Sequence, residues 1–111
     1  MSELEIICTV SRPVYDYSDR KYMNLHLDKP TVKKVNKIQF IPVQINPLVD
    51  DVLKVKLPFR YKKFEFKIIG DKTIYELLTG DTIIARIKYC GVWNLETFTG
   101  HAWKVISIKH Q

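Results

Sequence analysis

Lysine, arginine and aromatic residues are concentrated in the second half of the sequence. In two runs there, basic residues alternate with apolar ones, the pattern of a strand with one charged and one buried face. The charged face of residues 54–62 carries no acidic side chain. Rows of ammonium and guanidinium groups can neutralise a line of phosphates, and aromatic rings can stack on flat bases. The two rows consist of Lys54, Lys56, Arg60 and Lys62, and of Arg86 and Lys88.

The aromatic segment "YCGVWNLETFTGHAWKV", residues 89–105, adds further candidates for such contacts. Trp93 and Phe98 fall in a predicted ten-residue loop, 91–100, that begins and ends with glycine, where a ring either anchors the loop or offers a stacking surface. Trp103 has the position of a core residue in the strand that follows. The candidate nucleic-acid contacts are Lys54, Lys56, Arg60, Tyr61, Lys62, Lys63, Arg86, Lys88, Trp93, Phe98 and Lys104.

The distribution of charge points to the same half of the chain. The net charge is +6; residues 1–53 carry seven basic and seven acidic side chains, and residues 54–111 carry eleven and five. A one-sided basic surface favours polyanions, although such a charge can also serve only to keep a protein dispersed. The charge therefore supports, without requiring, a phosphate-containing partner.

No pattern in the sequence indicates an enzyme or a metal site. There is no glycine-rich phosphate loop, HExxH or G-x-S-x-G motif. Asp50 and Asp51 form an acidic pair without a nearby histidine or third carboxylate, and Cys90 with His101 would be a nucleophile and base that nothing orients. We therefore expect no catalytic residue, no metal, no cofactor and no small-molecule substrate.

The positions of the two cysteines suggest a cellular environment. Cys8 and Cys90 each lie in an apolar run and are predicted to be buried free thiols, with a disulfide as the alternative. The start of the chain lacks the basic region of a signal peptide, and the apolar runs are too short to cross a bilayer. We expect an intracellular, reducing location (cytoplasm or nucleus, or a host cell) and no membrane contact.

Short β-strands account for most of the remaining pattern. The expected strands cover residues 4–11, 21–27, 35–45, 53–69, 81–90 and 101–109, with a tyrosine-containing loop over 11–21. The apolar parity reverses at Lys62 and Lys63, which predicts a β-bulge in one long, bent strand. The aromatic residues expected in the core on this basis are Phe59, Tyr61, Phe64 and Phe66, of which Tyr61 could be turned outward at the bulge.

One short helix is predicted in "GDKTIYELLTGD", residues 70–81. Ile74, Leu77 and Leu78 would share a face of this helix. Asp71 or Thr73 would cap its start. Gly80 would end the helix after about two turns. The element order is therefore four β-runs, a short helix and a final β-hairpin.

This order, with the motifs of the last two strands, resembles a known family. "TGDTIIARIKYCGVWN" followed by "GHAWKVISI" is similar to the end of small single-stranded-DNA-binding OB-fold proteins, especially those of viruses and phages. The resemblance covers about residues 54–109. It implies a mainly β fold: a five- to six-stranded, OB-like closed barrel with one short α-helix before the last two strands, as a single domain over 1–111. Two departures are the extra β-run near the N-terminus and the basic ending "SIKHQ" in place of an acidic tail.

Two functions of different kinds remain open at this point. The first is non-sequence-specific binding of single-stranded DNA or RNA in replication, recombination or repair, through a basic β-face and stacking aromatics. The alternative is a structural or protein-interaction module of a larger, possibly viral, assembly, with Tyr15, Tyr17 and Trp93 as contact residues. Exposed strand edges make a homo-oligomer plausible in either case.

Overall fold

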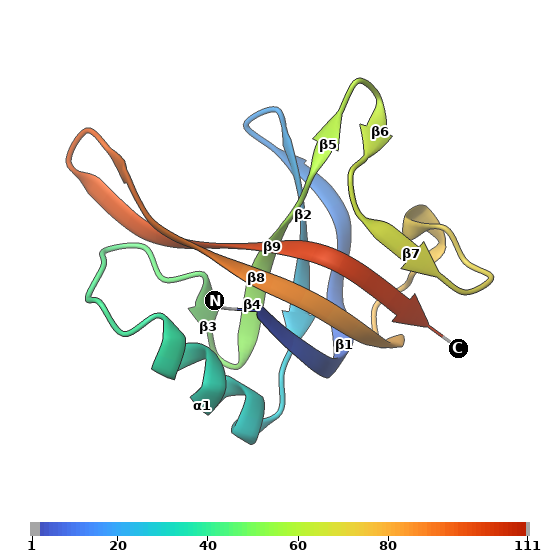
Figure 1. The fold of residues 1–111 in the computed structure, drawn as a ribbon, viewed down its shortest axis with the longest axis horizontal. Coiled ribbons are helices and arrows are strands. Elements are labelled where there is room, and N and C mark those ends of the chain that lie inside the picture. The colour runs from blue at the N-terminus through green and yellow to red at the C-terminus, as the bar shows by residue number, and fades with distance from the viewer. Residues whose placement is uncertain (1–2, 111) are drawn as a thin grey trace.

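The computed structural model describes residues 3–110 and is mainly β (Figure 1). Its strands are β1 (Glu3–Tyr17), β2 (Arg20–His26), β3 (Leu48–Val49), β4 (Val52–Leu57), β5 (Phe59–Arg60), β6 (Lys63–Phe64), β7 (Lys67–Ile69), β8 (Thr82–Leu95) and β9 (Phe98–His110). Its helices are α1 (Lys29–Ile38) and the single 3-10 turn η1 (Ile74–Glu76). Among these described residues, no helix is long and apolar enough to cross a membrane.

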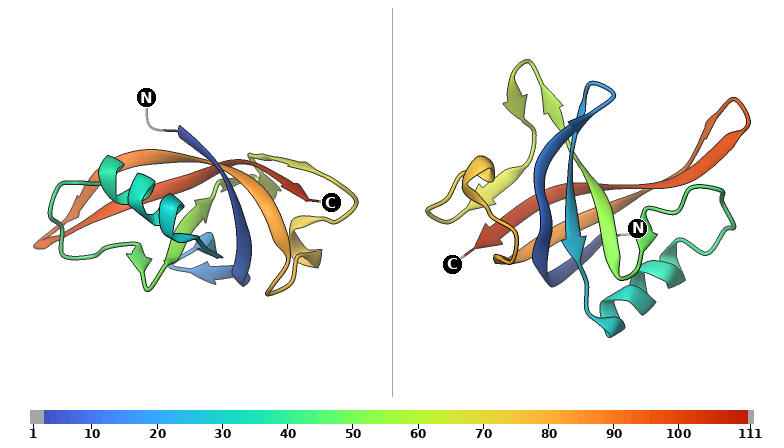
Figure 2. Two further views of the ribbon diagram at one scale, coloured as in Figure 1. Left: turned by 90° about the horizontal axis from the view of Figure 1, so that it is seen from below. Right: turned by 180° about the vertical axis from the view of Figure 1, so that it is seen from behind.

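Seven of the strands form one strongly curved sheet in the order β3-β4-β2-β1-β8-β9-β7. The sheet closes on itself where β4 and β9 meet in parallel, through one residue pair, Lys56 and Lys104. The ring therefore consists of β4, β2, β1, β8 and β9, with uneven contacts around it. Figure 2 shows the curvature, with α1 lying at one end of the ring.

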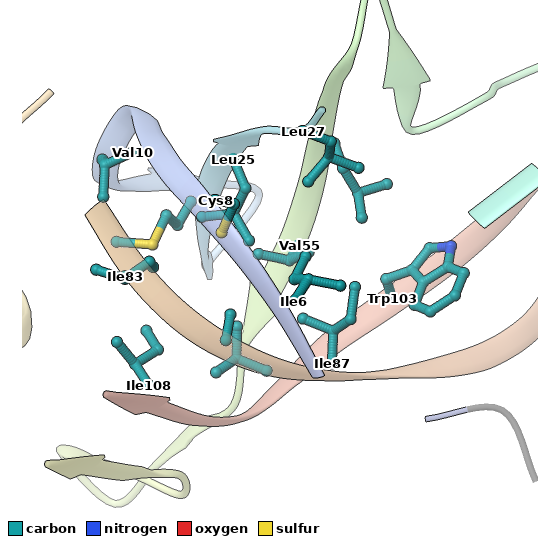
Figure 3. Packing of buried hydrophobic residues seen from close by; sticks show 14 of the residues in the cluster. Ile6, Cys8, Val10, Leu25, Leu27, Val55, Ile83, Ile87, Trp103 and Ile108 are labelled. Atoms are coloured by element: carbon teal, nitrogen blue, oxygen red, sulfur yellow. The ribbon is translucent and has the colours of Figure 1, made fainter. Parts of the chain in front are cut away.

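The core lies inside this ring because each ring strand turns alternate apolar residues inward. Met23 and Leu25 of β2, Val55 of β4, and Ile87 of β8 are fully buried. Figure 3 shows Leu25, Val55 and Ile87 meeting side chains of β1 and β9 around the ring interior. Trp103, predicted as core, is 2% exposed, and its indole nitrogen donates to Gln39 Oε1 at 2.9 Å.

The predicted long strand over 53–69 is wrong, because the segment holds four separate strands, β4 to β7, with a turn between β5 and β6. Pro58 follows the end of β4, and the reversal of parity is a two-residue turn, not a bulge: Tyr61 and Lys62 have φ of 53° and 64°. Positive φ at both central residues is the geometry of tight hairpin turns. The turn exposes Tyr61 by 88%, in agreement with the outward alternative for this residue, and Phe59 is 39% exposed, so the prediction that Phe59 is a core residue is wrong.

The predicted strand over 35–45 is wrong as well, since its first part belongs to α1. Asp28 caps this helix by accepting from the Thr31 amide at 2.9 Å, and a proline follows in the first turn. These are standard helix-start signals. Val35 is fully buried under the ring. β-branched residues gave the segment the composition of a strand.

Two further expectations about local structure need correction. The short helix before β8 is only the 3-10 turn η1, in which Glu76 Oε1 accepts from the Thr73 amide at 3.0 Å. The segment 11–21, expected as a loop, is the end of β1 and the start of β2, joined by a tight turn. The turn residues Ser18 and Asp19 have φ of 50° and 62°.

The predicted loop between Gly91 and Gly100 is absent, because β8 and β9 remain paired almost to their ends. Their pairing continues to Leu95 and Phe98, with Glu96 at φ 54° in the turn. We call residues 89–103 the arm. Figure 1 shows it extending beyond the ring, with the segment between α1 and β3 running beside it.

Candidate functional site

Three tyrosines form a cluster on the outer face of β1 and β2. Tyr22 points outward because its neighbour Met23 points into the core. Tyr15 lies directly opposite Tyr22 in the β1–β2 pair, with the ring centroids 6.0 Å apart. Tyr17 contacts Tyr22 edge-on at 6.4 Å and is 63% exposed. We call Tyr15, Tyr17 and Tyr22 the tyrosine cluster; it presents accessible aromatic surface.

Basic side chains lie directly over these rings. The guanidinium carbon of Arg12 is 3.8 Å from the Tyr15 centroid. Lys54 Nζ is 4.7 Å from the Tyr22 centroid and 5.6 Å from that of Tyr17. Cation–π attraction of this kind holds the charged groups against the aromatic surface. The cluster is therefore both aromatic and positively charged.

A polar contact fixes one ring of the cluster. The Tyr15 hydroxyl donates to Asn24 Oδ1 at 2.7 Å. Burial raises the pKa of the Tyr15 hydroxyl, against the opposing effect of the Arg12 charge, so this donor keeps its proton at neutral pH. Tyr15 therefore acts as support, and the more exposed Tyr17 offers the accessible ring.

A row of three lysines continues from the cluster across the outside of the ring. Lys56 of β4 lies opposite Tyr22 on one side and pairs with Lys104 of β9 on the other. Lys104 in turn lies opposite Lys88 of β8. Within residues 3–110, none of the three forms an ion pair. We call Lys56, Lys88 and Lys104 the lysine row.

The lysine row explains how the two basic runs of the sequence come together. β4 and β8 are not neighbours; β9 lies between them, and Lys104 fills the gap. Like charges directly opposite each other destabilise a sheet. Of the three lysines only Lys88 has an acidic residue opposite it, Glu3 of β1, and none forms an ion pair within residues 3–110. Their adjacency is therefore unfavourable for folding, and an anion on this face would offset their repulsion.

Arg86 lies beyond the end of this row. It pairs with Glu5 of β1 and with Ser107 of β9, and Glu3 lies opposite Lys88. Acidic residues of β1 therefore border the basic face on this side. The structure places Arg86 on the outer surface, next to a carboxylate and outside the continuous row.

The remaining basic candidates lie on the β5–β6 hairpin. Tyr61 and Lys62 form its turn, and Arg60 pairs with Lys63 directly beside the turn. Figure 1 shows this hairpin beside the β1–β2 turn, and Lys21 Nζ lies 4.8 Å from the Phe59 centroid across the gap. The hairpin therefore lies next to the end of the β1–β2 pair, where it contacts Lys21, whose position in the strand has the opposite parity to Tyr22 of the tyrosine cluster.

Trp93 and Phe98 lie on the arm, away from the tyrosine cluster along β8 and β9. The Trp93 indole lies on Gly100, where an added Cβ would overlap the ring, and its nitrogen donates to the His101 carbonyl at 3.2 Å. Trp93 is half-buried, whereas Phe98 is 51% exposed. Both the anchoring and the stacking interpretation of Trp93 remain predictions.

The potential nucleophile and base do not meet. The Tyr89 hydroxyl lies 2.6 Å from His101 Nδ1, and His101 Nε2 donates to the Ile41 carbonyl at 2.8 Å. His101 thus has partners other than Cys90 on both ring nitrogens.

Cys90, predicted to be buried, is exposed, whereas Cys8 is buried; both are free thiols. Over the described part of the chain, no group of three or more His, Cys, Asp or Glu side chains could hold a metal.

A shallow recess at the far end of the ring has polar lining groups that are paired with one another, apart from His110 Nδ1, which is buried without a partner among residues 3–110. It is lined by Lys72, Leu77, Asp81, Thr82 and His110. Lys72 Nζ pairs with Asp81 Oδ2 at 2.9 Å. The Leu78 amide donates to the same carboxylate and lowers the pKa of Asp81, with a further contribution from Lys72. The polar groups here stabilise the turn before β8.

Sequence reasoning did not assign Arg12, Tyr15, Tyr17 and Tyr22 to the basic site. The signal was present in part, since Tyr22 has the opposite parity to the buried Met23. What was missing was the pairing that places β2 between β1 and β4. No family model matches the chain, and no curated protein or solved structure has significant similarity to it.

Proposed function

We propose that this chain is a non-catalytic protein that binds single-stranded nucleic acid on the outer face of its ring. The observation that carries the proposal is the continuity of the tyrosine cluster with the unpaired lysine row. Bases stack on exposed rings such as Tyr17, and phosphates follow the lysines. Aromatic platforms beside a basic groove are typical of sequence-independent binding to single strands.

The energetic terms are of a suitable size for such binding. Each base stacked on an aromatic side chain contributes about 1–3 kcal/mol. Each lysine that neutralises a phosphate adds a salt-dependent term. Arg12 and Lys54 lie over ring faces of the cluster, so positive charge lies close to a base that stacks on an exposed ring such as Tyr17. Stacking and charge therefore act at the same place.

The arrangement of the strands supports an OB-like assignment as part of this proposal. In chain order the ring strands are β1, β2, β4, β8 and β9, and η1 lies between the third and fourth of them. An OB-fold has five strands in a partly open barrel, with its helix in the same interval. The run over 35–45, which exceeded the five strands, is not a ring strand: its first part, residues 35–38, belongs to α1.

Substitution of an exposed tyrosine tests the proposal. Tyr17→Ala removes a surface ring from the tyrosine cluster, and Tyr75→Ala removes a ring of similar exposure from η1 as a matched control. Binding of a fluorescent dT15 oligonucleotide is measured by anisotropy at low salt. We expect Tyr17→Ala to weaken binding by about 5- to 150-fold, the equivalent of one lost stack, and Tyr75→Ala to leave it unchanged.

Two results would overturn the proposal. One is wild-type protein that does not bind dT15 or rU15, or binds them without dependence on salt. The other is equal binding by the Tyr17→Ala and Tyr75→Ala variants. The same titration with a duplex of equal length distinguishes stacking on free bases from a general attraction to phosphate, because paired bases cannot stack on the protein.

A further inference from the structure

The arm has one occupied edge and one open edge. On the β9 side, the Ile45 amide donates to the Thr99 carbonyl at 2.9 Å, and the Thr99 amide donates to Gln44 Oε1 at 3.2 Å. On the β8 side, β1 pairs only as far as Lys88. In the described chain, residues 89–95 therefore have no neighbour on that side.

The open edge presents backbone hydrogen-bonding groups to the outside. Thr99 directs both its amide and its carbonyl away from β8, so its pair with Asn94 is of the type without mutual hydrogen bonds. In such a pair both residues direct their backbone groups outward. Asn94, and Val92 two residues before it, therefore offer free donors and acceptors along the open edge.

The composition of this edge is suited to pairing with a copy of itself. Residues 89–95 contain no charged residue and no proline, the two devices that natural edge strands use to prevent pairing. Val92 and Leu95 are 37% and 65% exposed. With a net charge of +6, two copies repel each other across most of their surfaces. The arm is a surface on which they can meet without bringing lysines together.

The arm is also held in place before any partner binds. Gln39 accepts from the Trp103 indole and donates to Asn46 Oδ1 at 2.9 Å, which ties the neighbouring segment to the arm. His101 binds the Ile41 carbonyl in the same segment. A preorganised edge loses little conformational entropy on association.

We propose that two copies of this chain associate through the open edges of β8, which pair antiparallel about a two-fold axis. Such an interface is isologous, because each copy contributes the same residues to it. The two arms then form one continuous sheet, as in strand addition to an exposed sheet edge. The outer faces that carry the tyrosine cluster and the lysine row stay outside the paired edges.

The test is the oligomeric state of the purified chain and two edge variants. Sedimentation velocity over about 1–200 μM should show a concentration-dependent dimer for the wild type. Val92→Lys places like charges across the two-fold axis, and Asn94→Pro removes an outward amide. Each should weaken the dimer at least about tenfold. Thr97→Lys adds the same charge at the exposed turn of the arm and is the matched control, with wild-type association.

Three outcomes would contradict the proposal. The first is a wild type that stays monomeric over the whole range, which would leave the edge to another protein. The second is association of Val92→Lys equal to that of the wild type, with folding verified by circular dichroism. The third is equal loss in Thr97→Lys. Val92→Lys should still bind dT15, so failure of this interface and failure of the nucleic-acid site are distinguishable.

Discussion

Removal of the lysine row should reduce the salt dependence of nucleic-acid binding by a calculable amount. Lys56, Lys88 and Lys104 lie in adjacent strands and form no ion pair within residues 3–110. If each neutralises one phosphate of a single strand, the triple glutamine variant loses about 0.7 × 3, or about 2, from the slope of log affinity against log salt. Between 50 and 200 mM salt, the wild type should then lose about 20-fold more affinity than the variant.

The assay is a dT15 anisotropy titration at four or more salt concentrations. The control variant carries glutamine at three exposed lysines of α1, namely Lys33, Lys34 and Lys37. Both triple variants reduce the net charge from +6 by 3 to +3, so a general charge effect would change both slopes equally. We expect the α1 variant to keep the wild-type slope, because its lysines lie away from the row.

Two results would refute this reasoning. Equal slopes for the two triple variants would show that only net charge matters. A wild-type slope in the lysine-row variant would show that phosphates do not contact these lysines. The urea midpoint gives an independent check: relief of repulsion between neighbouring ammonium groups should leave the lysine-row variant at least as stable as the wild type.

Three further predictions concern the core and the arm. Trp103→Phe leaves Gln39 Oε1 without its buried donor and should lower the free energy of unfolding, measured by urea titration, by about 1–3 kcal/mol. Adding Gln39→Leu to the same chain should restore part of that stability. Gly100→Ala should displace the Trp93 indole and destabilise the protein by about 1–3 kcal/mol. In a chain that already carries Trp93→Ala, the same substitution should cost little. If the losses of the two single variants simply add in the double variant, the contact between Trp93 and Gly100 is contradicted. Burial raises the pKa of Cys8 to about 12, so a thiol reagent should modify only the other cysteine in the folded protein. Because the unfolded thiol ionises near pH ~8.5, the stability from a protonated Cys8 should be complete below that pH and lost as pH rises towards 12, a decline that Cys8→Ala should remove.

Local pattern was a good guide wherever one strand buries one face. The alternation in β2, β4 and β8 identified their inward residues, such as Met23, Val55 and Ile87, and these are buried. It also identified Trp103 as core. Alternation is sufficient here because side chains on a strand point to opposite sides with a period of two.

Local pattern failed where a short-range signal competed with composition. The β-branched residues of α1 resembled a strand, although Asp28 and Pro30 marked a helix start. A reversed parity was interpreted as a bulge, whereas Tyr61 and Lys62 form a turn with positive φ at both positions. Tyrosine and lysine do not indicate such a turn in a sequence, because asparagine and glycine are the usual residues with this conformation.

The sequence by itself determined a mainly β chain with its positive charge in the second half, and it determined which residues of most ring strands face inward. Only the tertiary structure decided which strands are neighbours. It inserted β9 between β4 and β8, so Lys104 joins Lys56 to Lys88, and it set β2 against β4, so Tyr22 meets Lys54 and Lys56. The physical reason is that strand pairing depends on contacts between residues far apart in the chain, which no local periodicity encodes.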